Sequence, residues 1–211
     1  MKEIYTCPSC GADIDFKCYF SMCNTCSSCK SVVVKHGVNL ETYGKTSEFP
    51  PDLSPLQIGT TGIYKNDHFE IIGRQRVHYD RGFWDEWFVA FENGADGWIA
   101  HAQGFYMFSV EAKHVLSPPL REDVQVNKMV SVNQVFYTVD DIKRVTHSLS
   151  SGELPMFNTK ETKRTSVDLS NNQNKFLNLE YYDGLTKIFQ GEYCDFKTFK
   201  FQNLKELDGW Q

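Results

Sequence analysis

The sequence has no long apolar run and no strong excess of charge of one sign. No stretch approaches the roughly 18 to 20 apolar residues that cross a bilayer as a helix, and the N-terminal segment MKEIYTC lacks the apolar region of a secretory signal. We therefore expect a cytoplasmic protein without membrane insertion, in which thiols stay reduced. The formal net charge of -5 argues against broad electrostatic binding to nucleic acid.

The common motifs of enzyme chemistry are also missing. The sequence contains no phosphate-binding glycine loop, no dinucleotide fingerprint, no H-E-x-x-H and no G-x-S-x-G. The six histidines are scattered singly, so no pair of them predicts a metal centre. The sequence names no catalytic residue, and a non-catalytic role is the expectation.

Cysteine, in contrast, is concentrated near the N-terminus. Two Cys-x-x-Cys turns are separated by residues 11–25, and four sulfurs at this spacing are typical of structural zinc. We predict a zinc ribbon over residues 1–37 with these ligands: Cys7, Cys10, Cys26 and Cys29.

The cysteines outnumber the ligands that one ion needs. Cys23 and Cys26 could also form a turn, and Cys18 is spare. We favour Cys26 with Cys29 because CSSCKSVVV runs directly into a β-branched strand. Residues 1–37 hold four Lys and three Asp or Glu, a balance that favours a structural role or a protein contact over DNA binding.

The rest of the chain is predicted to be mainly β. Residues 38–54 are proline-rich towards their end and are predicted to form a linker. Short aromatic and β-branched runs, separated by turn residues, then predict an all-β domain over 55–211. It could comprise two small barrel or sandwich modules, at 55–120 and 126–205.

A shift of the chain by 67 residues suggests an internal duplication. It superimposes Asn66 on Asn133 and Glu86 on Glu153, among other pairs. If the duplication is real, each module carries one glutamate at the same place.

Glu86 is the best candidate for a polar site outside the ribbon. Alternation places it on one face of a strand with Trp84, where a charge is costly unless it is paired. The expected partners are Arg74 and Arg76 on the preceding strand. A structural ion pair is the favoured interpretation of Glu86, and a ligand-binding site is the alternative. The candidate residues for this ligand-binding or structural polar site are Glu86, Glu153, Arg74, Arg76, Trp84 and Trp87.

Several motifs together resemble the domain-of-unknown-function 4178 family. They are the segments Leu56–Gly59, Phe69–Arg74, Trp84–Phe88 and Gly97–Ile99. The resemblance implies an all-β domain without established enzymatic activity, in front of which a CPxCG zinc ribbon is a common arrangement. Such proteins are often encoded beside small membrane proteins and relatives of phage-shock-protein A, which implies an accessory role at a membrane-associated or stress-related complex.

We therefore expect a non-catalytic zinc-ribbon adaptor. Its ribbon would dock a protein partner, and its β body would present a sheet edge or an aromatic cleft. One alternative is a small-ligand-binding protein or an enzyme with a cleft between the two modules, using Glu86 and Glu153. A further alternative is the binding of single-stranded nucleic acid through the ribbon.

Overall fold

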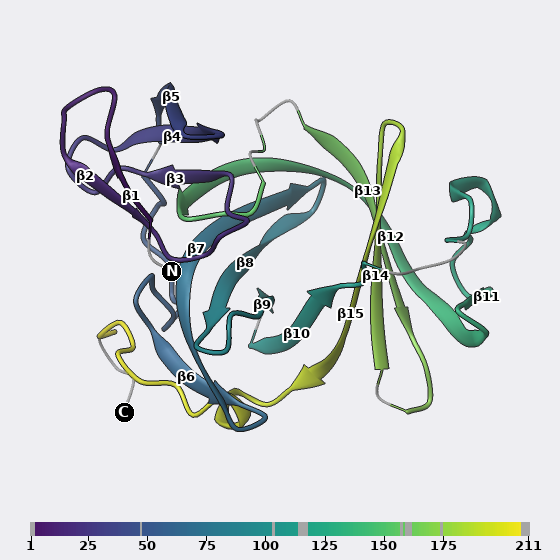
Figure 1. The fold of residues 1–211 in the computed structure, drawn as a ribbon. Helices are drawn as coiled ribbons and strands as arrows, with labels where there is room; N and C mark the ends of the chain where they lie inside the picture. The colour runs from purple at the N-terminus through teal and green to yellow at the C-terminus, as the bar shows by residue number, and fades with distance from the viewer. Residues whose placement is uncertain are drawn as a thin grey trace.

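The computed structural model describes residues 3–46, 48–102, 104–113, 118–156, 158, 162–173 and 175–207. Within these residues the regular structure consists of fifteen strands and two short 3-10 helices. The expectation of a mainly β protein is confirmed, and Figure 1 shows how the strands are arranged.

The N-terminal module is a small body of two sheets. Strands β1 (Glu3–Thr6) and β2 (Asp13–Phe16) form a hairpin. The second sheet contains β3 (Cys23–Thr25), β4 (Ser31–His36) and β5 (Asn39–Lys45). The β-branched run in β4 supplies Val33, which is fully buried against residues of the hairpin.

The predicted linker is shorter than expected. Gly37 adopts a left-handed φ of 62°, which allows a tight turn, and the chain returns as β5 to pair with β4. Strand β5 was not predicted because most of its side chains are exposed, so it shows no buried face in the sequence. The connection from β5 to the next strand of the chain spans residues 46–60.

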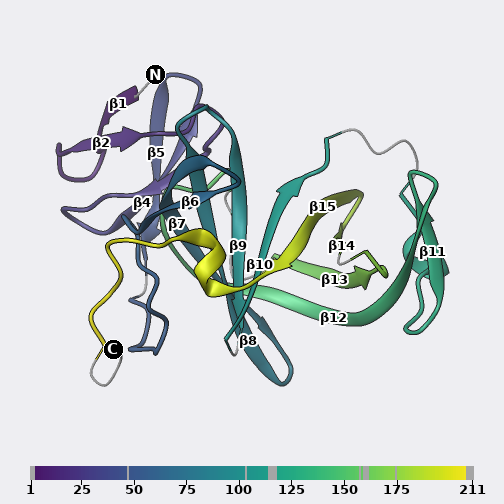
Figure 2. The same ribbon diagram turned by 90° about the horizontal axis from the view of Figure 1, so that it is seen from below.

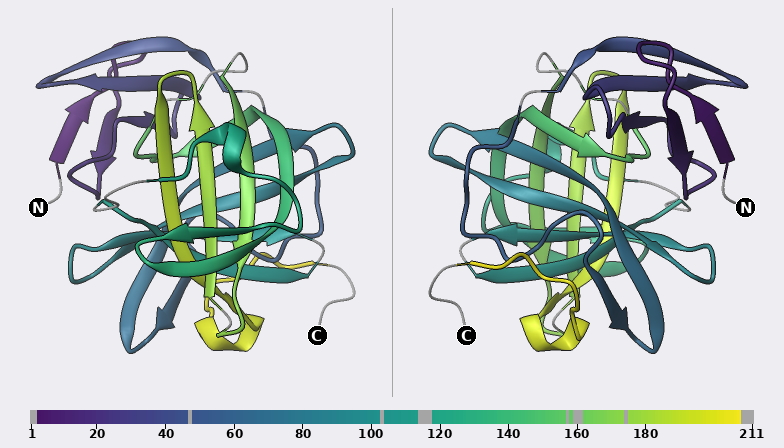
Figure 3. Two further views of the ribbon diagram at one scale, coloured as in Figure 1. Left: turned by 90° about the vertical axis from the view of Figure 1, so that its right-hand side faces the viewer. Right: turned by 90° about the vertical axis from the view of Figure 1, so that its left-hand side faces the viewer.

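The remaining strands form one ten-stranded antiparallel sheet, in the order β11-β12-β13-β14-β15-β10-β9-β8-β7-β6. Because β7 also pairs with β12, eight of these strands close into a ring (Figures 1 and 3). The strands are β6 (Thr61–Tyr64), β7 (Asp67–Tyr79), β8 (Gly82–Phe91), β9 (Asp96–Ala102), β10 (Phe105–Glu111), β11 (Met129–Val132), β12 (Val135–Gly152), β13 (Lys163–Ser170), β14 (Lys175–Tyr182) and β15 (Leu185–Cys194). The 3-10 helices are η1 (Arg121–Asp123) and η2 (Phe196–Phe199).

The closed sheet contains two meanders of five strands each, β6–β10 and β11–β15. Both begin with a two-residue turn in the left-handed conformation, at Lys65-Asn66 and at Asn133-Gln134. The meanders are not separate modules, because β7 pairs with β12 and β10 pairs with β15.

The expected equivalence of Glu86 and Glu153 is wrong. Glu86 lies in β8, whose topological counterpart is β13, whereas Glu153 follows the end of β12. The shift of 67 residues fails because the first hairpins are related by an offset of 68 residues, from the pair Tyr64–Asp67 to the pair Val132–Val135.

Two large apolar clusters lie on the outer face of the closed sheet and are covered by other parts of the same chain. On the first meander, residues such as Trp87 and Ile99 pack against Leu56 and against Phe199 of η2. On the second meander, residues such as Val167 pack against Val124 and the β11 hairpin. Since alternate side chains face opposite sides, polar and aromatic residues line the inside of the ring.

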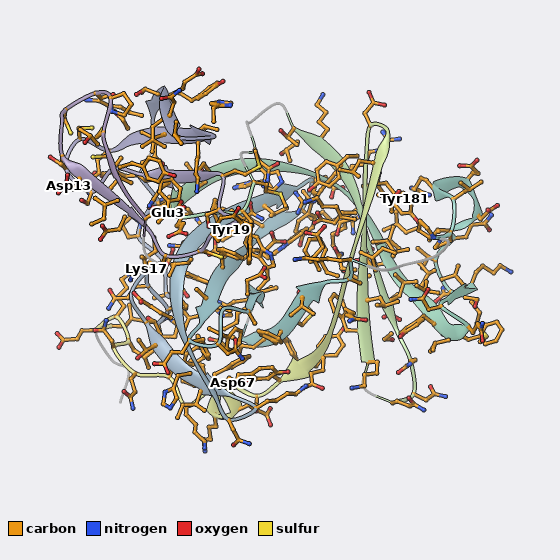
Figure 4. The ribbon with its side chains drawn as sticks, viewed as in Figure 1. Glu3, Asp13, Lys17, Tyr19, Asp67 and Tyr181 are labelled. Atoms are coloured by element: carbon orange, nitrogen blue, oxygen red, sulfur yellow. The ribbon has the colours of Figure 1, made fainter. Side chains whose placement is uncertain are left out.

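The N-terminal module docks on one end of the closed sheet, as Figures 1 and 2 show for the purple segment. Leu154 forms a β-bridge with Cys23, with N–H···O distances of 2.9 and 3.1 Å. The buried Glu153 carboxylate accepts hydrogen bonds from the backbone N–H groups of Lys17 (2.8 Å) and Cys18 (2.7 Å). Figure 4 places Lys17 and Tyr19 where the module meets the closed sheet.

Residues 17–23 of the module also cover inward-facing side chains of the ring. Cys18 and Cys23 share an apolar cluster with three large residues from β8, β9 and β15: Phe88, Trp98 and Phe189. Gly73 allows this close approach, because a Cβ built at Gly73 would lie 2.0 Å from the carbonyl oxygen of Glu153. The module therefore closes one end of the ring.

We expect the substitution Glu153→Gln to lower the free energy of unfolding by about 2 kcal/mol, because an amide NH₂ would replace one acceptor that faces a buried N–H donor. Urea unfolding measures the change, with the exposed Glu122→Gln as a control that we expect to stay within about 0.5 kcal/mol of the parent. Equal stability of the two variants would contradict the docking role.

Candidate metal centre and internal cavity

The four predicted cysteines converge in the N-terminal module. The sulfur atoms of Cys7, Cys10, Cys26 and Cys29 all lie within 4.8 Å of one another. The Sγ–Sγ distances are 3.8 Å between Cys7 and Cys29 and 3.7 Å between Cys10 and Cys26. Four sulfurs at about 2.3 Å from a tetrahedral ion would be separated by about 3.8 Å. The cluster therefore has the geometry to bind one metal ion.

The two cysteine turns have the same backbone design. The N–H of Gly11 donates to the carbonyl of Cys7 (2.9 Å), and the N–H of Lys30 donates to the carbonyl of Cys26 (3.0 Å). Gly11 and Lys30 occupy the same place in their turns, and both have a positive φ, of 77° and 60°. The preference for Cys26 and Cys29 as the second pair agrees with this geometry.

Cys18 and Cys23 do not join the cluster. Both are buried where the module meets the closed sheet. Burial raises the pKa of Cys18 to about 11 and that of Cys23 to about 12, so both remain neutral thiols at neutral pH. These two cysteines pack as small apolar side chains rather than as metal ligands.

A cavity of about 240 Å³ lies inside the closed sheet. All eight strands of the ring contribute to its lining. The apolar part includes Trp84, Trp98, Met107, Phe176 and Phe189. The polar part includes Gln75, Glu86, Lys143, Asp168, Asn178 and Glu180.

Glu86 belongs to a hydrogen-bonded network inside the ring. Its carboxylate accepts hydrogen bonds from the Gln75 amide (2.5 Å) and from the Trp84 indole N–H (2.7 Å). It also lies 3.6 Å from the Arg164 guanidinium, which forms a shorter ion pair of 2.6 Å with Glu180. Burial raises the pKa of Glu86, and the nearby Arg164 only partly opposes this effect.

The expected pairing of Glu86 with Arg74 and Arg76 is wrong. In β7 these arginines point to the outer face, whereas Glu86 faces the cavity from β8. Their partner from β8 is the buried Asp85, at 2.7 Å from Arg74 and 2.8 Å from Arg76. Asp52, from the connection after β5, binds both arginines as well.

The six residues of the predicted polar site therefore occupy three places. Glu86 and Trp84 face the cavity, and Glu153 holds the N-terminal module. Trp87 lies on the outer face, where the Arg74 guanidinium stacks 4.5 Å from its ring centroid. Trp87 and the two arginines thus belong to the structural contact that anchors Phe49 and Asp52 of the connection after β5.

The sequence reading missed the polar residues of the second meander, Arg164, Asp168 and Glu180. Their signal is the alternation in KRTSVDLS and KFLNLEYY, where polar residues alternate with Val, Leu or aromatic residues. Such alternation usually indicates one solvated face. Here the polar face points into a cavity because the sheet closes on itself.

Together these features define a mainly β protein with a four-cysteine cluster that could bind a metal ion and a closed sheet around a cavity. The chain belongs to the family described as Domain of unknown function (DUF4178), whose match covers residues 57–196. The matched region contains the closed sheet and leaves the cysteine module outside. Searches of curated proteins and of solved structures return no match.

No helix in the described part of the chain has the length and apolar character needed to span a membrane.

Buried His147 makes the stability of the closed sheet dependent on pH. Burial, together with the adjacent Arg164, lowers the pKa of His147 to about 2 from the ordinary value of 6.5. The unfolded chain binds a proton below pH 6.5 and the folded chain does not, so this residue's contribution is present above pH 6.5 and is lost as the pH falls.

When the pH falls from 7 to 5, the free energy of unfolding of the parent protein should decrease by about 2 kcal/mol more than that of the variant His147→Gln. The reason is that a glutamine side chain does not titrate in this range. Urea unfolding at the two pH values measures the difference. The exposed His36→Gln should keep the pH dependence of the parent. The same loss in His147→Gln as in the parent would refute the assignment.

Proposed function

We propose that this protein is a non-catalytic, zinc-containing binding protein whose closed sheet holds a small ligand. The cavity of about 240 Å³ inside the ring carries this proposal. Its lining combines large apolar side chains with a few converging polar groups, which is typical of small-molecule sites. The alternative considered from the sequence placed Glu86 and Glu153 in such a site; Glu86 lines the cavity, whereas Glu153 binds the N-terminal module.

The size of the cavity limits the ligand. An apolar cavity of about 150 Å³ in another protein holds benzene, which has six non-hydrogen atoms. By proportion, the cavity in this protein has room for about ten non-hydrogen atoms. We infer that the ligand is a small molecule, or the end group of a larger one.

Zinc is the metal that we propose for the cysteine cluster. Four thiolates at tetrahedral spacing leave no open position, which is typical of structural rather than catalytic zinc. In this proposal zinc also fixes the position of residues 17–23, which close one end of the ring. These residues lie between the two cysteine turns. Metal binding would therefore hold the cover of the cavity in place.

An adaptor role of the module remains part of the proposal. Three large side chains on the segment that covers the ring, residues 17–23, are exposed: Tyr19 at 79%, Phe20 at 37% and Met22 at 48%. Exposed side chains of this kind favour contact with a protein partner. We propose that such a partner belongs to a membrane-associated or stress-related complex in the cytoplasm.

Metal analysis tests the zinc centre. We expect about one zinc per chain in protein purified without chelator, and almost none in the double variant Cys7→Ser/Cys10→Ser. The matched control Cys18→Ser should keep its zinc, because Cys18 lies outside the cluster. Iron instead of zinc, or the loss of zinc from the control, would contradict the proposal.

A thermal-shift screen of small molecules tests the cavity. We expect the screen to identify compounds that stabilise the parent protein. At a concentration of about 100 times its dissociation constant, such a compound should raise the melting temperature by several degrees. The same ligands should have no effect on Ala100→Leu, which fills part of the cavity, and the full effect on Ala95→Leu at an exposed turn. The absence of any stabilising compound, or equal shifts in both variants, would refute binding inside the ring.

A further inference from the structure

We propose that the cavity selects a small organic cation, such as an ammonium group attached to an apolar body. This inference rests on the proposed ligand-binding function and specifies the class of ligand. The charge balance of the cavity carries it, and the aromatic lining supports it independently.

The charges inside the ring do not cancel. Among the described residues of the interior, three carboxylates, those of Glu86, Asp168 and Glu180, face two cations, Arg164 and Lys143. His147 is neutral, because its pKa is lowered to about 2. By formal charge, the described part of the interior therefore has one carboxylate more than it has cations, and a buried charge without a counterion is costly.

Asp168 is where the positive charge is missing. Its side chain keeps 33% of its exposure, and the cavity is the space that it faces. One oxygen accepts a hydrogen bond from the Asn178 amide (2.9 Å), which is neutral. The other oxygen lies 3.9 Å from the Lys143 ammonium, too far for a hydrogen bond.

Lys143 does not compensate Asp168 fully, because it is shared. Its ammonium forms a closer ion pair with Asp141, whose side chain is half-exposed. Burial raises the pKa of Asp168, and the Asn178 hydrogen bond and Lys143 only partly offset this effect. A ligand ammonium beside Asp168 would supply the charge-assisted hydrogen bond that this carboxylate lacks.

The aromatic lining favours the same ligand class. Tyr79 and Trp84 line the cavity with ring centroids 5.8 Å apart, and Phe176 lines it from β14. Faces of aromatic rings attract cations, and the Lys143 ammonium already lies 5.6 Å from the centroid of the Tyr79 ring. The remaining wall, which includes Trp98 and Met107, suits an apolar body.

An anionic ligand is the wrong match for this interior. It would approach Glu86, Asp168 and Glu180, while both available cations are already bound to carboxylates. A neutral ligand could fill the space but would leave the excess charge uncompensated. Cationic, neutral and anionic ligands should therefore bind with different affinities. Three probe molecules of similar shape and different charge can distinguish them.

Isothermal titration of the full zinc-loaded chain at pH 7.5 tests the inference with three such probes. They are 2-phenylethylamine as the cation, 2-phenylethanol as the neutral analogue and phenylacetate as the anion. We expect the amine to bind about 10-fold more tightly than the alcohol, and the anion to show no measurable binding. The substitution Asp168→Asn should reduce the affinity for the amine about 10-fold and leave that for the alcohol unchanged, with the exposed Asp183→Asn as the matched control.

The outcomes separate this inference from the proposed function. Equal binding of amine and alcohol, or tighter binding of the anion, would overturn the selection of cations while ligand binding in the cavity stands. The same affinity for the amine in parent and Asp168→Asn would overturn the role of Asp168. If no probe binds at millimolar concentration, the proposed ligand class is wrong. The thermal-shift comparison of Ala100→Leu with Ala95→Leu then decides separately whether the cavity binds any ligand. If Asp168→Asn fails to fold, the order of the three probes on the parent protein still decides.

Discussion

The backbone pairing of β7 with β12 closes the sheet into a ring. Without it, the ten strands would form an open sheet with one apolar and one polar face. With it, the sheet closes, and the polar face becomes an interior in which every carboxylate needs a partner. The network that joins Glu86, Arg164 and Glu180 meets this need and leaves space around it.

Closure in this direction leaves the apolar face on the outside, so the chain has to cover it. The segments before and after the closed sheet perform this task on the first meander, where Leu56 and Phe199 join one cluster. The connection between the meanders performs it on the second, through Val124 and the β11 hairpin. The connecting segments thus stabilise the fold as much as the strands do, since burial of apolar surface is the main favourable contribution.

The N-terminal module links the four-cysteine cluster to the cavity. The segment between the cysteine turns supplies the N–H groups that bind Glu153 and the side chains that pack on Phe88, Trp98 and Phe189. Trp98 and Phe189 also line the cavity. These two residues therefore contact both the cysteine module and the space inside the ring. A small domain of this size has little core of its own, and the zinc that we propose would offset that deficit.

Local patterns in the sequence were sufficient for several features. The spacing of Cys7, Cys10, Cys26 and Cys29 predicts their convergence, because each turn is a local structure with its own hydrogen bonds. The β-rich body and the family also follow from short motifs, and the match over residues 57–196 confirms the latter. The placement of Glu86 on the same face as Trp84 follows from strand alternation, and the structure agrees with it.

Other features were decided only by the tertiary structure. Alternation shows that a strand has two faces but not which of them is enclosed, so the residues Arg164, Asp168 and Glu180 resembled a solvated face in the sequence. The partners of Arg74 and Arg76 depend on which neighbouring side chain shares their face, and the sequence could not distinguish Asp85 from Glu86. The cysteine turns and the strands could be predicted from the sequence, because these depend on neighbours along the chain. The tertiary structure alone decided the cavity and the docking role of Glu153, because both arise where β7 meets β12 and where the module meets the ring.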